Sequence, residues 1–103
     1  MAVLELNQSN VAAVMRKQGY VAVKVWGPNC PHCAAAKQIW QKLAAGEVAL
    51  YQLNAAKAPA VSKRWRVRAV PSFLLFKNGK EVARFHGAIT AKRLQAWLDS
   101  AQK

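Results

Sequence analysis

Apolar residues along the chain recur with two different spacings, one typical of strands and one typical of helices. Strand-like segments lie at 3–6, 20–26, 48–53, 73–76 and 81–85. Helical segments lie between N-caps at 7–9 and Gly19, over 30–45, from Pro59 to about Trp65, and after an N-cap at Thr90. The regular alternation of the two kinds, without repeats or a long linker, indicates one α/β domain over residues 1–103.

The segment 20–26 reads Tyr-Val-Ala-Val-Lys-Val-Trp and is nearly continuous in apolar character. Such a run is typical of a central strand that helices cover on both faces, and Lys24 is its one exception. Between the last two predicted strands, Asn78-Gly79 favours a tight turn. These two strands are therefore predicted to be antiparallel.

Composition and charge narrow the choice of function. A 53% apolar content over 103 residues is too high for a disordered tail, and no apolar run is long enough to predict a membrane segment. Residues 1–9 show no secretory signal, so we expect a cytoplasmic protein. The 16 Lys and Arg against 4 Asp and Glu give a net charge of +12, which favours acidic partners.

The basic residues include a run between 57 and 68 that contains no acid. Its members are Lys57, Lys63, Arg64, Arg66 and Arg68. Such a run is either a solvated helix face or a docking patch for an acidic protein. A basic module that binds nucleic acid is the alternative from another class. That alternative rests on net charge alone, because basic and aromatic residues do not interleave as they do on single-strand binding surfaces.

Cys30 and Cys33 lie at the start of the predicted helix 30–45. Two thiols three residues apart cannot cross-link distant parts of a fold, so local thiol chemistry is favoured over a structural disulfide. The N-terminus of a helix stabilises an anion and so favours a Cys30 thiolate. We predict that Cys30 attacks a disulfide and that Cys33, one turn into the helix, resolves the mixed disulfide. A metal site completed by His32 and His86 is the alternative.

Several motifs together resemble the thioredoxin family over essentially the whole chain. They are the Cys-x-x-Cys after the second strand, Ala69-Val70-Pro71-Ser72-Phe73, Phe76-Lys77-Asn78-Gly79 and Gly87. The resemblance implies a thioredoxin fold, with a five-stranded mixed sheet flanked by four helices. It also implies that Cys30 and Cys33 cycle between dithiol and disulfide, and that Pro71 is cis and faces the disulfide. The residues expected to contact substrate proteins are Trp26, Asn29, Val70 and Gly87.

The same resemblance implies a reaction and its partners. A thiol–disulfide oxidoreductase of this kind exchanges its disulfide with protein disulfides and is recharged by a flavin-dependent reductase. The chain itself needs no bound cofactor, since two sulfurs carry the redox equivalents, and we expect a monomer. Use of glutathione, as in glutaredoxins, is less favoured because their Gly-Gly element after the cis-proline strand is absent at 85–88.

The dipeptide between the cysteines departs from the common thioredoxin pattern. Pro31-His32 stands where thioredoxins usually have Gly-Pro, and it is similar to the thiol oxidases of the superfamily. His32 would stabilise the Cys30 thiolate by a hydrogen bond or by charge. Because a stabilised thiolate favours the reduced state, we predict a raised reduction potential. An oxidase-like or isomerase-like activity is the alternative to a reductant.

Two further residues depart from that pattern. Lys24 aligns with a buried acid that assists proton transfer at the resolving cysteine, so we expect Lys24 near Cys33. The other interpretation is that the long side chain of Lys24 snorkels to the surface. Asn29 replaces the aromatic residue beside the nucleophile, which predicts a more polar substrate groove.

Overall fold

The computed structural model describes residues 3–102 and contains one mixed five-stranded sheet of order β1-β3-β2-β4-β5. The strands are β1 (Leu4–Leu6), β2 (Tyr20–Trp26), β3 (Ala49–Asn54), β4 (Ser72–Lys77) and β5 (Lys80–His86). The helices are α1 (Val11–Met15), α2 (Pro31–Gln41), α3 (Pro59–Arg64) and α4 (Ala91–Ala101). Strands β1, β3 and β2 are parallel, whereas β4 and β5 pair antiparallel with their neighbours. The predicted mixed sheet with four flanking helices is confirmed.

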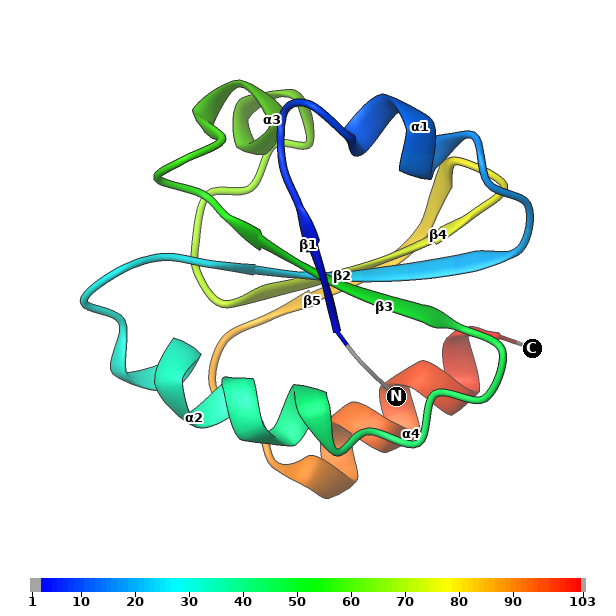
Figure 1. The fold of residues 1–103 in the computed structure, drawn as a ribbon. Coiled ribbons are helices and arrows are strands. Elements are labelled where there is room, and N and C mark those ends of the chain that lie inside the picture. The colour runs from blue at the N-terminus through cyan, green and yellow to red at the C-terminus, as the bar shows by residue number, and fades with distance from the viewer. Residues whose placement is uncertain (1–2, 103) are drawn as a thin grey trace.

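The helices form two layers, with α1 and α3 on one face of the sheet and α2 and α4 on the other (Figure 1). Alternate residues of β2 supply the two cores. Val21, Val23 and Val25 belong to one buried cluster, while Ala22 belongs to the other, together with Trp40 of α2. Burial on both faces explains the nearly continuous apolar run of the central strand.

The predicted hairpin between β4 and β5 is confirmed, and two features of its turn require a glycine at position 79. Asn78 and Gly79 both adopt positive φ, 51° and 83°, as a tight two-residue turn between antiparallel strands demands. A Cβ atom at Gly79 would also lie 2.5 Å from the carbonyl oxygen of Met15, at the end of α1. The turn is therefore packed against the first helix.

The predicted helix 30–45 is shorter in the structure and ends at Gln41. The backbone of Ala44 is bound instead by the side chain of Gln95 on α4. The Gln95 amide oxygen accepts from the Ala44 N–H at 3.0 Å, and the Gln95 amide nitrogen donates to the Ala44 carbonyl at 2.9 Å. These bonds replace the intrahelical ones, which local spacing could not foresee.

The first helix also begins later than predicted, after an N-cap at Asn10 rather than at 7–9. The side-chain oxygen of Asn7 accepts the backbone N–H groups of Ser9 and Asn10 at 2.8 and 2.9 Å, which forms a turn before the helix. The predicted N-cap at Thr90 is confirmed, because its hydroxyl accepts the Arg93 N–H at 3.2 Å. Within residues 3–102 there is no helix with the length and apolar character needed to cross a membrane.

Candidate active site

Cys30 ends the loop between β2 and α2, and Cys33 lies in the first turn of α2. The two cysteines form a disulfide with a Cα–Cα distance of 5.2 Å. Cys30 is the N-cap residue, in an extended conformation, and Pro31 begins the helix with no N–H of its own. Cys30 is half-buried, whereas Cys33 is only 4% exposed. Cys30 is therefore the cysteine that a partner molecule can reach.

The backbone around Cys30 suits a negatively charged sulfur. The Cys33 N–H donates to the Cys30 Sγ at 3.2 Å, as an N-cap side chain accepts from the first helical turn. After reduction, the same N–H and the positive end of the helix would stabilise a thiolate at Cys30.

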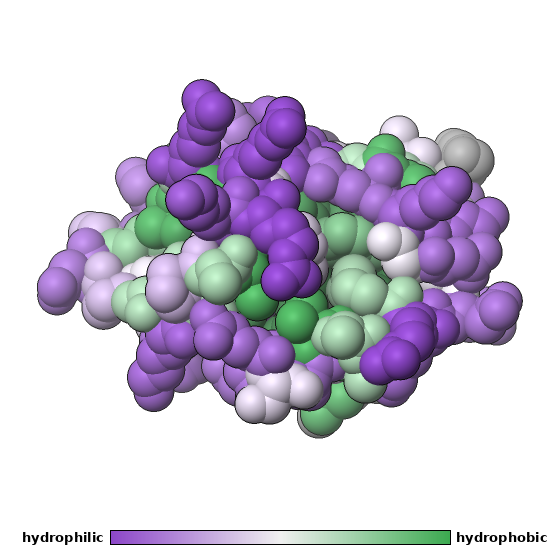
Figure 2. All heavy atoms as spheres, turned by 90° about the horizontal axis from the view of Figure 1, so that it is seen from above, coloured by the Kyte–Doolittle hydropathy of each residue, from purple (hydrophilic) through white to green (hydrophobic). Residues whose placement is uncertain are grey.

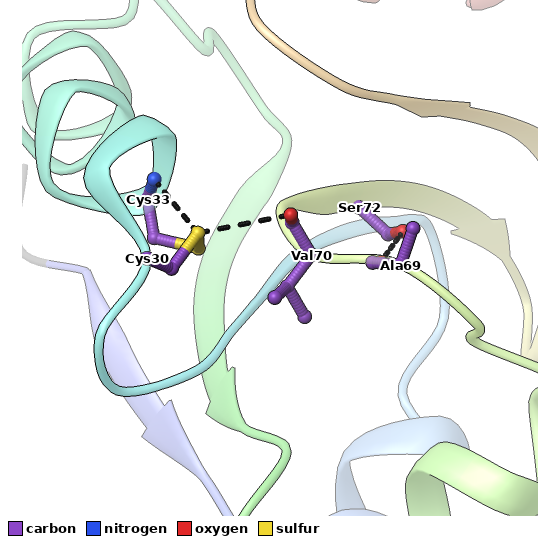
Figure 3. The surroundings of a disulfide bond; sticks show 5 residues. All are labelled: Cys30, Cys33, Ala69, Val70 and Ser72. Carbon is purple, nitrogen blue, oxygen red and sulfur yellow. Dashed lines mark hydrogen bonds between the residues drawn. A yellow bond between two sulfur atoms is a disulfide. The ribbon is translucent and has the colours of Figure 1, made fainter.

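A loop before β4 approaches the disulfide from the other side. The peptide bond between Val70 and Pro71 is cis, and the Val70 carbonyl oxygen lies 3.7 Å from the Cys30 Sγ (Figure 3). The Ser72 hydroxyl donates to the Ala69 carbonyl across this turn. This loop, 69–72, is called the cis-proline loop below. It gives a reduced Cys30 thiol a carbonyl acceptor, the oxygen of the half-buried Val70.

Gly87 joins the same surface from the end of β5. Its N–H donates to the Pro71 carbonyl at 3.1 Å, and its φ is 102°, a conformation that favours glycine. Val70 and Gly87 are half-buried, while Pro71 is buried. The chain thus brings the predicted substrate-contact residues Val70 and Gly87 together around Pro71.

The opposite side of the disulfide borders a cavity of about 590 Å³, called the lysine cavity below. Residues in its wall include Lys24, Trp26, Cys30, Cys33, Lys37 and Gln52. The sheet register explains part of this wall, because Lys24 of β2 pairs with Gln52 of β3 and Gln52 pairs with Glu5 of β1. The Gln52 amide donates to the Glu5 carboxylate at 2.7 Å.

Lys24 is 2% exposed and so does not reach the surface as a snorkelling side chain would. Among the hydrogen bonds and ion pairs formed within residues 3–102, none has the Lys24 ammonium as its donor. Burial, reinforced by the nearby charge of Lys37 and opposed by Glu5, lowers the pKa of Lys24 from 10.5 to about 8. Lys24 is thus a buried amine in a cavity wall shared with Cys33.

Comparison with known proteins agrees with this geometry. The sequence profile of the family described as Thioredoxin matches residues 2–100. The chain belongs to the thioredoxin family. A crystal structure of Malassezia sympodialis thioredoxin (Mala s 13) superposes with a TM-score of 0.88, covering 99% of this chain and 92% of that one at 22% identity. That likeness identifies the fold as a thioredoxin fold.

Curated thioredoxin-family relatives are longer than this chain. The chloroplastic thioredoxin M-type of Spinacia oleracea is 31% identical over 93 residues, which cover 87% of this chain and 50% of that protein. Glutaredoxin-3 of Bos taurus is 33% identical over 76 residues, covering 72% of this chain and 23% of that protein. The chain therefore spans half or less of the length of these relatives.

The remaining predicted residues of this thioredoxin-family site lie at its rim. Trp26 is half-buried in the wall of the lysine cavity, and Asn29 is exposed with a positive φ of 56°. His32 is exposed on α2, and no hydrogen bond within residues 3–102 joins it to a cysteine. His86 is exposed on β5. In the same part of the chain, no three His, Cys, Asp or Glu side chains form a group that could hold a metal ion.

Lys37 and Arg84 border the site but were not predicted from the sequence. Lys37 lies four residues after Cys33, a helical spacing that places both on one face of α2. Arg84 alternates with His86 along β5, and both line a smaller cavity of about 240 Å³ beside the cis-proline loop. The sequence spacing could have suggested that Lys37 lies near Cys33 and Arg84 near His86. The cavities that these residues line depend on the tertiary fold.

Proposed function

We propose that this chain is a thiol–disulfide oxidoreductase that exchanges the Cys30–Cys33 disulfide with disulfides of protein substrates. The observation that carries the proposal is the position of the Cys30 sulfur, half-buried at the N-terminus of α2 and 3.7 Å from the carbonyl of Val70. This sulfur combines accessibility with backbone groups that favour the thiolate. A substrate chain would lie along Trp26, Val70 and Gly87.

The reaction proceeds by two displacements. The Cys30 thiolate attacks one sulfur of the substrate disulfide, forms a mixed disulfide and releases the other substrate sulfur as a thiolate. Cys33 then loses its proton and attacks the Cys30 sulfur, which forms the Cys30–Cys33 bond and releases the second substrate thiol. Two electrons pass from the chain to the substrate, and the two thiol protons of the chain end on the two substrate thiols.

Lys24 is the proposed positioning residue for the proton of Cys33. Both side chains lie in the wall of the lysine cavity. A neutral Lys24 amine can take the Cys33 proton, and a charged Lys24 stabilises the Cys33 thiolate. With a pKa of about 8, Lys24 exists in both forms near neutral pH. Either route makes the resolution step depend on this amine.

The direction of electron flow depends on the reduction potential. We propose a reductant of thioredoxin type, recharged by a flavin-dependent reductase, whose potential is raised by Pro31-His32. If the Pro31-His32 dipeptide favours the Cys30 thiolate by about 2 kcal/mol, the potential rises by on the order of 45 mV. An oxidase-like or isomerase-like role is the second candidate, and the same dipeptide favours it.

Acidic proteins are the proposed substrate class. The basic patch consists of Lys57, Lys63, Arg64, Arg66 and Arg68, all exposed and all on α3 or its flanking loops. Figure 2 views the face that carries α1 and α3, and hydrophilic side chains cover most of it. The patch leads into the cis-proline loop, so an acidic surface docked on it would lie beside Cys30.

The deciding measurement is the equilibrium of the Cys30–Cys33 pair with a glutathione redox couple, followed by reduction of a protein disulfide. A reductant of thioredoxin type should remain reduced under cytosolic couples and reduce the protein disulfide catalytically. Failure of the Cys30–Cys33 pair to exchange with either partner would contradict the proposed function. A potential near that of strong oxidants would support the oxidase-like candidate instead.

A further inference from the structure

The lysine cavity contains two cationic side chains and no acid in its wall. Lys24 projects from the central strand and Lys37 from α2, and they are close enough for the charge of Lys37 to lower the pKa of Lys24. An ammonium removed from water is costly unless an anion or hydrogen-bond acceptors replace the water. The wall therefore has the charge of an anion-binding site.

The nearest acid on the same row of the sheet, Glu5, raises the pKa of Lys24 through its charge but forms no ion pair with it within residues 3–102. Glu5 is two strands away from Lys24, with Gln52 between them. Neighbouring strands lie about 4.8 Å apart, so the two backbones are separated by roughly 10 Å. The Glu5 carboxylate also accepts the Gln52 amide at 2.7 Å. Lys24 is thus left facing the cavity.

The cavity wall also includes the side chain of Trp26, whose indole N–H is itself buried from solvent. The rest of the wall is largely apolar and includes Pro28, Pro31 and Ala34. A volume of about 590 Å³ lies within the range of sites that hold small organic molecules. The cavity therefore combines cationic donors with apolar walls.

We propose that the lysine cavity binds small organic carboxylates, and that small disulfides bearing a carboxylate are substrates of Cys30 and Cys33. The carboxylate pairs with Lys24, and the aliphatic part lies against the apolar wall, which also contains both cysteines. This inference rests on the proposed function only for its redox step. Binding of the carboxylate requires no thiol chemistry.

The redox step follows the same two displacements as the protein reaction. The Cys30 thiolate forms a bond to one sulfur of the small disulfide, whose S–S bond breaks and releases one small thiolate. Cys33 attacks Cys30, the Cys30–Cys33 disulfide forms, and the second small thiolate leaves. The two electrons and the two thiol protons of the chain end on the two small thiols.

Binding is tested on the oxidised protein with thiodiglycolate, a dicarboxylate thioether that has no disulfide. Backbone amide shifts measured by NMR at pH 7 should saturate at residues around the cavity. Its uncharged analogue, thiodiethanol, should bind the same protein at least tenfold more weakly. Equal affinities for the two compounds, or carboxylate-induced shifts confined to the basic patch, would overturn the proposal.

Variants identify the cation responsible. Lys24→Met keeps a linear side chain of similar length and should weaken thiodiglycolate binding at least tenfold, while Lys24→Gln provides a second, polar replacement. Lys92→Met removes the same charge from an exposed position on α4 and should leave the affinity within twofold. If Lys92→Met weakens binding as much as Lys24→Met does, the net charge of the protein binds the anion and the cavity does not.

The redox step is tested by comparing dithiodiglycolate with 2-hydroxyethyl disulfide as substrates of the reduced protein. Each rate is divided by the rate with dithiothreitol, which removes the intrinsic reactivity of the two disulfides. The normalised preference for the carboxylate should be at least tenfold and should fall towards unity in Lys24→Met. If thiodiglycolate binds saturably but neither disulfide is turned over, the proposed function is contradicted and the carboxylate-binding site still stands. If both disulfides are turned over equally and thiodiglycolate does not bind, the carboxylate-binding site is contradicted and the proposed function still stands.

Discussion

The two sides of the Cys30–Cys33 disulfide present different chemistry to a partner. On the side of the cis-proline loop lie backbone groups, the Val70 carbonyl at 3.7 Å from the Cys30 sulfur and the Gly87 N–H bonded to Pro71. On the other side, the wall of the lysine cavity includes the side chains of Lys24 and Lys37.

This difference separates what any protein substrate needs from what only some ligands need. Backbone groups can pair with an extended chain without regard to its sequence. A buried cation such as Lys24 favours a charged ligand, because an uncharged one would leave it without an acceptor. Under the two proposals made above, general substrate binding and chemical selectivity would lie on opposite sides of one pair of sulfurs.

The largest expected effect comes from the sulfurs themselves, where the two sides meet. Cys30→Ser should abolish exchange with disulfides of every kind, because no attacking thiolate remains. Cys33→Ser should instead accumulate mixed disulfides, detectable by mass spectrometry under non-reducing conditions. Iodoacetamide should modify Cys30 before Cys33 in the reduced protein. Earlier alkylation of Cys33 would reverse the assigned roles.

The second prediction concerns stability on the lysine-cavity side. The fall in the pKa of Lys24 from 10.5 to about 8 corresponds to about 3 kcal/mol by which the fold disfavours the charged amine. Well below pH 8 Lys24 is protonated in both the folded and the unfolded state, so this cost is fully present, and at pH 7 most of it remains. Lys24→Met should therefore raise the free energy of unfolding at pH 7 by about 1 to 3 kcal/mol.

The pH dependence supplies the control for this prediction. Between about pH 8 and 10.5 the unfolded chain holds the Lys24 proton and the folded chain does not, so wild-type stability should rise relative to Lys24→Met. Denaturant unfolding of the oxidised proteins at several pH values measures this difference. A constant difference from pH 7 to 10.5 would mean that burial does not act on the charge of Lys24.

The same variant addresses the proposed role of Lys24 in resolution. Lys24→Met should slow the attack of Cys33 on the mixed disulfide and alter the pH profile of that step, while the attack of Cys30 changes little. Rapid-quench measurements with a small neutral disulfide separate the two steps. Unchanged resolution rates from pH 6 to 9 would restrict Lys24 to ligand binding and stability.

The third prediction concerns the dipeptide that lies between the two sides. Replacing Pro31-His32 with Gly-Pro should lower the reduction potential by on the order of 45 mV, because a side chain that favours the Cys30 thiolate is removed. His32 is exposed, so a contribution from charge would fall when salt is added, whereas a contribution from a hydrogen bond would not. The measurement is equilibration with a glutathione couple at low and high salt. An unchanged potential in the variant would remove His32 from the mechanism.

The two sides also differ in how far they could be predicted from the sequence. The cis-proline side follows from motifs within a few residues of one another, and the structure has the cis peptide bond before Pro71 that the resemblance implied. The cavity side depends on the register of three strands and on a helix packed over them. Local patterns singled out Lys24 but left its burial open, and they said nothing of Lys37.

The helix ends show the same limit. The N-cap at Thr90 is readable because the hydroxyl and the N–H that it accepts are three residues apart. The end of α2 is not readable in the same way, because Ala44, which the spacing placed in the helix, is bonded instead to Gln95, 51 residues away along the chain. Contacts within one turn can be read from the sequence, whereas contacts between elements need the fold.

The smallest expected effect lies in the basic patch beside the cis-proline loop. Replacing Arg64, Arg66 and Arg68 with Gln should slow reaction with an acidic disulfide peptide about fivefold at low salt and leave a neutral peptide unaffected. Added salt should abolish the difference, because these side chains are exposed and their charges are screened within about 8 Å at physiological ionic strength.

A matched control neutralises three exposed lysines elsewhere, Lys42, Lys80 and Lys92, and so makes the same change in net charge. If the two triple variants slow the acidic peptide equally, the net charge of +12 steers the substrate without a defined docking surface. If only the arginine variant slows the reaction with the acidic peptide, charges around the cis-proline loop select acidic substrates without contacting the sulfurs. The contrast with the lysine cavity would then be one of distance, since a buried amine acts on a ligand at contact and an exposed guanidinium acts through solvent.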